Sequence, residues 1–255
     1  MTGKLVVRLA LLSAVLALTA MAGQITLGFP GSGQFGDAAI SPTGTYTDVM
    51  GGDHIAHIVI GGNIDASGAV APGAWPTNIG LSLAALEAIA GVGCDVSQLP
   101  ADPCAAPVTP IPLGVGNGSA VWWHIEAEGG DYISRSVNFV ANDYIDFGSA
   151  GFYDDFAFFW VSNGNTTSYD VLGRIDVLKG GVGDFGSTGP FLFQHAFTGP
   201  EAEYTVGFGV VNVGPAGYST FSDSALLLDT VPEPSSLLLA GPALLLAGLW
   251  KRRRA

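Results

Sequence analysis

The chain has 255 residues, of which 48% are hydrophobic and 12% are charged, and its formal net charge is −13. Enough apolar residues are present for a buried core, which excludes a wholly disordered chain. Six of the nine basic residues lie in the two ends, 1–22 and 231–255, so the body between them holds 21 acidic and three basic side chains. Phosphate backbones are bound through cationic side chains, so this acidic body excludes nucleic acid as a partner.

Residues 1–22 have the features of a secretory signal peptide. Lys4 and Arg8 precede an apolar stretch from Leu9 to Leu18, and Ala20-Met21-Ala22 forms the small-x-small pattern that a signal peptidase cleaves. The apolar stretch is shorter than the roughly 20 residues that span a bilayer, so it fits a cleaved signal helix better than a permanent anchor. We therefore predict that signal peptidase is a partner and that residues 23–230 form the exported domain.

The apolar residues of this domain follow the two-residue period of β-strands. Val121 to Glu128 alternates apolar with polar side chains after Trp122, so one face can pack inward while the other meets water. The runs 55–60, interrupted only by His57, and 156–161 are apolar, which predicts strands that are covered on both faces. Further strands are predicted at 25–28, 136–140, 170–178, 190–197, 204–210 and 225–228, with Gly-rich breaks at 61–63, 114–118, 180–183 and 214–217.

One helix is predicted, from Ser82 to Ala90, with Ser82 as its N-cap and Leu83, Leu86 and Ala90 along one side. Short strands joined by Gly-rich turns, with a single short helix, are typical of a β-sandwich or jelly roll. The predicted fold class is therefore all-β.

Cys94 and Cys104 are the only cysteines of the chain, and nine residues separate them. In an oxidising compartment this pair is expected to form one disulfide that closes the loop after the helix. A zinc site is the alternative, and it would need a second pair of ligands that the neighbouring sequence does not supply.

Acidic residues supply the candidate metal ligands and catalytic groups. Asp143, Asp146, Asp154 and Asp155 lie within 13 residues, and calcium prefers several such oxygen ligands. The alternative is that these are solvated turn residues. Two carboxylates across a groove could also hydrolyse a glycosidic bond, for which Asp154 and Glu126 are candidates.

The remaining motifs do not indicate a nucleotide-binding or metal site. Gly31 to Gly36 spells GxGxxG, but no helical pattern follows that could bind a pyrophosphate. The four histidines are interpreted as ordinary surface or core residues. Three tryptophans could stack on sugars, although aromatic residues on strands are more often part of the core: Trp75, Trp122 and Trp160.

The last 25 residues contain three elements in order. They are Val231-Pro232-Glu233-Pro234, an apolar run of 14 residues from Leu237 to Trp250, and the cations Lys251, Arg252, Arg253 and Arg254. The cations are expected to stay cytoplasmic and to stop transfer, which leaves the acidic body outside the membrane. The run would extend only about 21 Å as a helix, which is marginal for a permanent anchor.

This tail resembles the PEP-CTERM sorting signal of Gram-negative bacteria, in which a Pro-Glu-Pro motif, a short apolar helix and an Arg-rich end follow one another. The resemblance implies recognition by an exosortase, a membrane cysteine peptidase thought to remove the helix and pass the protein to the surface. The body also resembles the jelly-roll-like domain often found before such tails, at residues 118–120, 153–159 and 222–229. That resemblance implies no catalytic residues.

The sequence thus predicts an exported, non-enzymatic β-sandwich that is anchored transiently in the membrane and then processed. Its expected place is the cell surface or an extracellular polysaccharide matrix, with a structural or adhesive role. Two alternatives stay open: a secreted glycan-active enzyme, and a calcium-dependent carbohydrate-binding module. No cofactor is expected other than calcium.

Overall fold

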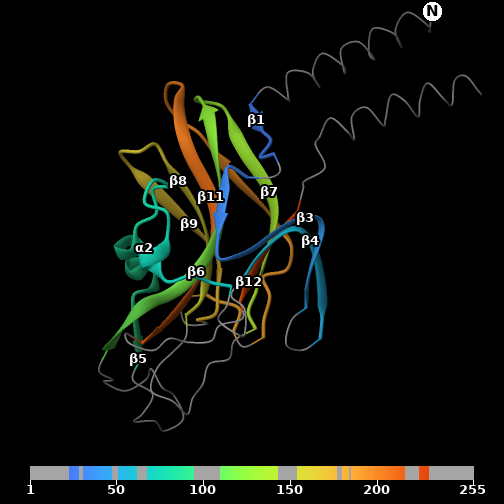
Figure 1. The fold of residues 1–255 in the computed structure, drawn as a ribbon, viewed down its shortest axis with the longest axis vertical. Coiled ribbons are helices and arrows are strands. Elements are labelled where there is room, and N and C mark those ends of the chain that lie inside the picture. Colours follow the sequence, from blue (N-terminus) through green and yellow to red (C-terminus); the bar gives the residue numbers. More distant parts are fainter. Residues whose placement is uncertain are drawn as a thin grey trace, which may run out of the picture.

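The computed structural model describes residues 23–28, 31–47, 51–61, 68–94, 110–142, 154–176, 180–183, 185–215 and 224–229. These residues form two six-stranded β-sheets with one α-helix and one short 3-10 helix beside them (Figure 1). The predicted all-β sandwich with a short helix is confirmed for these residues. The predicted signal helix and tail helix lie outside them. Within the described ranges, no helix is long and apolar enough to cross a membrane.

The first sheet, sheet A, contains β10 (Phe191–Ala196), β7 (Tyr132–Val140), β1 (Gln24–Ile25), β12 (Ala225–Asp229), β4 (Asp53–Gly61) and β3 (Asp37–Thr47). β10 follows one edge of β7 from residue 132 to 137. β1 and β12 pair with residues 132–133 and 136–140 of β7, so both lie along its other edge.

The second sheet, sheet B, contains β5 (Val92–Cys94), β2 (Gly33–Phe35), β6 (Pro110–Ala127), β11 (Ala202–Pro215), β8 (Phe156–Ser162) and β9 (Thr167–Arg174). Its long central pair is β6 with β11, which run antiparallel from Ala127 opposite Ala202 to Leu113 opposite Pro215.

Eight of these strands are nested about the β8–β9 hairpin. β8 pairs with β9, β7 with β10, β6 with β11, and β4 with β12. The order across sheet A is therefore β4-β12-β7-β10, and the order across sheet B is β6-β11-β8-β9. One long hairpin rolled into two layers would produce this arrangement.

The main core fills the space between the two sheets. Alternate residues of β6 and β11, such as Trp123 and Phe208, meet Ile58 of β4 and Phe139 of β7 from the opposite sheet. Removing this apolar surface from water is the dominant stabilising contribution to such a sandwich.

A second apolar cluster lies on the outer face of sheet B, where the segment 68–94 covers part of it. This segment contains η1 (Pro72–Ala74) and α2 (Leu83–Ala90). Leu86 and Ala90 of α2 pack with three aromatic residues that point outward from β6 and β8: Trp122, Phe158 and Trp160. The predicted helix is confirmed, and the side chain of Ser82 accepts a hydrogen bond from the Ala85 N–H as the expected N-cap.

Two details of the prediction were wrong. The Gly-rich stretch 114–118, predicted as a break, lies inside β6. A Cβ on Gly118 would lie 2.8 Å from the carbonyl oxygen of Val210 and 3.2 Å from the Trp75 ring, so glycine is present there because neighbouring groups approach closely. The run 55–60 is not covered throughout, because Ile55 is 73% exposed although Ile58 and Ile60 are buried.

Candidate functional site

The outer face of sheet B changes from apolar to polar along its strands. Gly207 of β11 lies between Trp122 and Trp160, and the segment 68–94 covers this row. Two residues closer to the start of β11, Thr205 lies between His124 and Ser162. The outward-facing residues beyond that row are glutamates rather than aromatic residues, and the covering segment ends before it reaches them.

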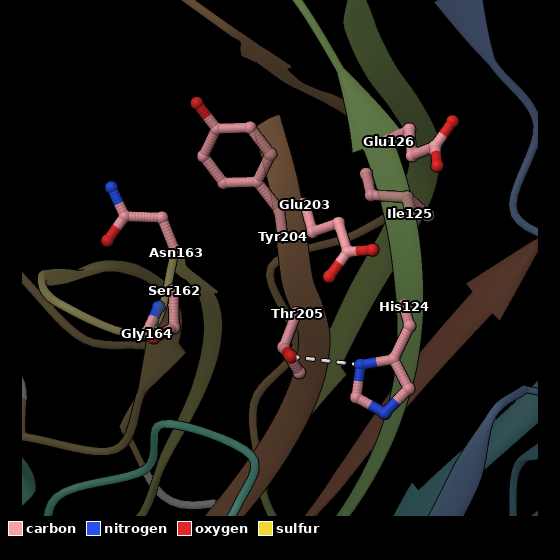
Figure 2. A pocket seen from close by; sticks show the side chains of 9 residues that line it. All are labelled: His124, Ile125, Glu126, Ser162, Asn163, Gly164, Glu203, Tyr204 and Thr205. Carbon is pink, nitrogen blue, oxygen red and sulfur yellow. Dashed lines mark hydrogen bonds between the residues drawn. The ribbon is translucent and has the colours of Figure 1, made fainter. Parts of the chain in front are cut away.

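A cleft with a volume of about 600 Å³ lies over this polar part of the face. Its lining includes six polar residues from β6, β11, the end of β8 and the turn after β8: His124, Glu126, Ser162, Asn163, Glu203 and Thr205. Figure 2 shows Glu126 and Glu203 extending from neighbouring strands, beside a 3.0 Å hydrogen bond between His124 Nδ1 and Thr205 Oγ1. The volume lies within the range of about 300 to 1,000 Å³ that is usual for small-ligand sites.

Glu126 and Glu203 are direct cross-strand partners. The Cβ atoms of such partners are about 4.5 to 5.5 Å apart, and like charges in that position are destabilising. Both side chains are exposed, so solvent screens much of this repulsion. A ligand that donates hydrogen bonds or carries positive charge would lower the repulsion further, which makes the pair a candidate binding element.

The border of the cleft is fixed by hydrogen bonds between sheet B and the covering segment. Thr167 Oγ1 donates to the Gly80 carbonyl at 3.1 Å and lies 3.0 Å from Ser162 Oγ. The Ser82 N–H donates to the Tyr169 hydroxyl at 2.9 Å. A Cβ on Gly80 would lie 2.4 Å from Ser162, so the backbone there approaches the sheet closely.

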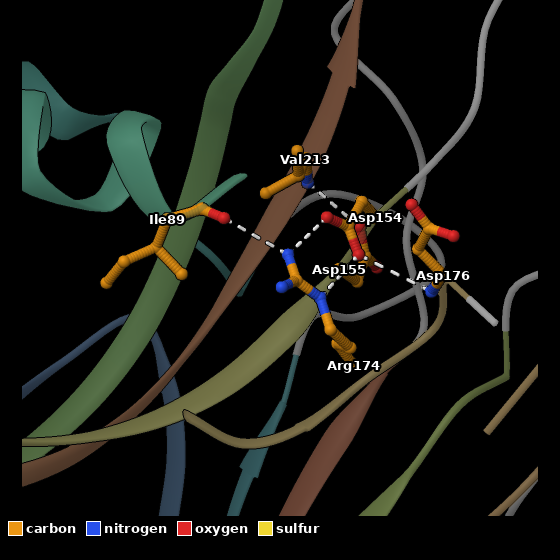
Figure 3. Close-up of polar contacts among 6 residues, drawn as sticks. All are labelled: Ile89, Asp154, Asp155, Arg174, Asp176 and Val213. Carbon is orange, nitrogen blue, oxygen red and sulfur yellow. Dashed lines mark hydrogen bonds and ion pairs between the residues drawn. The ribbon is translucent and has the colours of Figure 1, made fainter. Parts of the chain in front are cut away.

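Two of the four predicted calcium ligands, Asp154 and Asp155, lie at the opposite end of sheet B and are fully buried. Asp154 forms an ion pair with Arg174, whose guanidinium also donates to the Ile89 carbonyl at 3.2 Å (Figure 3). Asp155 accepts hydrogen bonds from the Val213 N–H at 2.8 Å and from the Ser224 hydroxyl at 3.1 Å.

These contacts tie α2, β9, β11 and the residue before β12 to the start of β8. The two aspartates therefore have structural roles in the described part of the chain. Asp143 and Asp146 lie outside it, so the calcium prediction is not tested for them. Among the described residues, no group of three or more His, Cys, Asp or Glu side chains is arranged to hold a metal ion.

The remaining predicted residues fall into two groups. Trp75, Trp122 and Trp160 are buried in the cluster on the outer face of sheet B, as expected for core aromatics. Cys94 ends β5, but Cys104 lies outside the described residues, so the disulfide stays a prediction. The sorting motif at Val231 to Pro234 and the cations at Lys251 to Arg254 also lie outside them.

The alternating pattern of residues 121–128 predicts Glu126 on a strand face that meets water, whereas we did not predict Glu203, Thr205 or Ser162 as site residues. Large and small side chains alternate in the predicted strand 204–210, and Thr205 occupies one of the small positions on its outward face, which was the available signal. The pairing of Glu203 with Glu126 depends on the register of β11 against β6. The pattern within either strand does not contain that register.

Comparison of the chain with protein-family models, with curated proteins and with solved structures gave no match.

Proposed function

We propose that this chain is an exported jelly-roll protein of a Gram-negative bacterium, sorted at the membrane by an exosortase and then retained at the cell surface or in its polysaccharide matrix. The nested pairing of eight strands, four in each sheet, supports the jelly-roll assignment. The signal-like start and the PEP-CTERM-like tail support export and sorting. Its role in the matrix is adhesive and non-enzymatic.

The observation that carries the adhesive role is the polar cleft on sheet B. Its carboxylates accept hydrogen bonds, and its hydroxyl, amide and imidazole groups donate or accept them, which suits the hydroxyl groups of sugars. The paired glutamates and the acidic body would repel a polyuronate. We therefore propose a neutral polysaccharide or an amino-sugar polymer as the ligand.

The binding test compares three polymers: a neutral glucan, a partly deacetylated glucosamine polymer and a polyuronate. Retardation of the full-length protein in gels containing each polymer reports binding. The double substitution Glu126→Gln and Glu203→Gln should weaken binding to the amino-sugar polymer about tenfold or more, because it removes two charge-assisted hydrogen-bond acceptors.

Glu201→Gln is the matched control, since Glu201 is exposed and precedes β11 without lining the cleft. Equal binding by the double variant and this control would contradict the assignment of the cleft. Preferential binding of the polyuronate would contradict the proposed ligand class.

The register of Glu126 opposite Glu203 also favours a second candidate, a glycan-active enzyme with these two carboxylates as its acid and base. Asp154 is not available for that role, because it is buried against Arg174. Release of reducing ends from any of the three polymers, abolished in the double variant and retained in Glu201→Gln, would establish the enzyme and remove the adhesive proposal.

Sorting is tested separately by the intact mass of the protein recovered outside the cell. Cleavage after residue 22 and loss of the apolar tail are the expected changes. A full-length mass in the cytosol would contradict export whatever the cleft binds.

A further inference from the structure

Most open strand edges in the described sheets carry features that oppose pairing with another chain. β3 contains Pro42, and its register against β4 shifts between Ile40 and Gly44. β9 carries the exposed charge of Asp170. β1, β2 and β5 are only two or three residues long. Proline, charge, bulges and short length are the usual protections of an edge strand.

β10 has none of these features. Its sequence, FLFQHA, contains no Asp, Glu, Lys, Arg or proline, and its one ionisable side chain, His195, lies 3.6 Å from Asp170 of β9. β10 pairs with β7 in unbroken register over all six residues. No other described strand lies along its second edge. Phe191 and Leu192 are 37% and 54% exposed. A regular edge that is largely apolar and has no Lys, Arg, Asp, Glu or proline is a template for strand addition.

The distribution of charge indicates what kind of strand can approach this edge. Residues 185–200 contain no Asp, Glu, Lys or Arg, and their one ionisable side chain is His195, whereas the body of the chain has 21 Asp and Glu and three Lys and Arg. Two copies of so acidic a protein repel each other over most of their surfaces. That repulsion is smallest along β10. A positively charged partner would instead be attracted to the acidic surfaces elsewhere on the molecule.

We propose that β10 pairs antiparallel with β10 of a second copy, which joins sheet A of the two molecules into one continuous sheet. The contact is isologous, so each copy supplies the same backbone groups and the same apolar side chains. Six residues extend about 20 Å, so the interface is small and the association is expected to be weak. Such a contact forms where copies are concentrated, as on a surface.

The first test is the molar mass of the purified full-length protein in sedimentation experiments between about 10 µM and about 1 mM. The wild type should move from monomer toward dimer over this range. Raising the ionic strength should strengthen the association, because salt screens repulsion between two acidic bodies while leaving strand pairing intact.

Leu192→Lys should weaken the dimer about tenfold or more, since it places charge on the pairing strand of both copies. Leu83→Lys is the matched control, because Leu83 lies on α2 and is 38% exposed. Circular dichroism establishes that both variants are folded. A monomeric wild type at the highest concentration, or equal dimerisation of the two variants, would overturn the proposal.

Hydrogen exchange of the wild type gives an independent test that needs no substitution. Amides within 191–196 should become more protected as the protein concentration rises, because half of them face the open edge of β10. Concentration-dependent protection at another strand instead of β10 would also overturn the proposal.

Discussion

Replacing Arg174 by methionine should destabilise the fold strongly, because it removes a cation while leaving the Asp154 carboxylate buried. The Asp154 side chain is 0% exposed and that of Arg174 is 13% exposed. Arg174 Nε donates to Asp154 Oδ1 at 3.0 Å, and the guanidinium lies 5.7 Å from the centre of the Phe156 ring. Deleting one partner of a buried ion pair typically costs about 3 to 5 kcal/mol.

The surroundings of Asp154 place the expected loss near the lower limit of that range. The Asp176 N–H lies 3.4 Å from Asp154 Oδ1 and continues to donate to it after the substitution. We therefore expect Arg174→Met to lower the free energy of unfolding by about 3 kcal/mol. For a domain of this size the melting temperature would fall by roughly 6 to 12 °C.

Urea unfolding followed by tryptophan fluorescence measures this change. The double variant Arg174→Met with Asp154→Asn should be more stable than Arg174→Met alone, because the buried charge is gone. Asp170→Asn on the same strand is the control: its side chain is 52% exposed, and we expect a change below about 0.5 kcal/mol. An Arg174→Met variant within about 1 kcal/mol of wild type would refute the proposed role of the pair.

Two further predictions concern the outer face of sheet B. Gly207→Ala should cost about 1 to 3 kcal/mol in urea unfolding, because its Cβ would lie 2.2 Å from the buried Trp160 ring, whereas Gly28→Ala, with nothing within 4 Å, should be close to neutral. Burial raises the pKa of Tyr169 above its ordinary value of 10.0, although the hydrogen bond from Ser82 lowers it in part. The unfolded chain therefore ionises first, and stability should fall as the pH rises through about 10 toward the folded-state pKa. The urea midpoint should decline less steeply in Tyr169→Phe, and parallel pH profiles would contradict this expectation.

Local sequence patterns predicted most strands and the only described α-helix. Ser82 gave the helix start because its hydroxyl can cap the first turn. The apolar run 156–161 correctly indicated a strand covered on both faces, and the cover proved to be sheet A on one side and the segment 68–94 on the other. These features depend on neighbouring residues, so they can be recognised within a short stretch of sequence.

Features that depend on distant partners were not predictable in this way. Asp154 was predicted as a candidate calcium ligand or a solvated turn residue, but it is buried and its role is set by Arg174 on the next strand. Gly118 looked like part of a turn, yet it is required within β6 because Trp75 packs over it. Likewise, Glu203 becomes a candidate binding residue only because the register of β11 places it opposite Glu126.

The position of β12 determines how the body would respond to a pull on its carboxyl end. β12 is an interior strand that pairs with β4 on one side and with β7 on the other, and Asp229 is its last residue. Tension along the strand would load both ladders in shear, so many hydrogen bonds would have to break together. An edge strand peels away one bond at a time. A pull on the carboxyl end of β12 would therefore meet more resistance than the same pull on an edge strand.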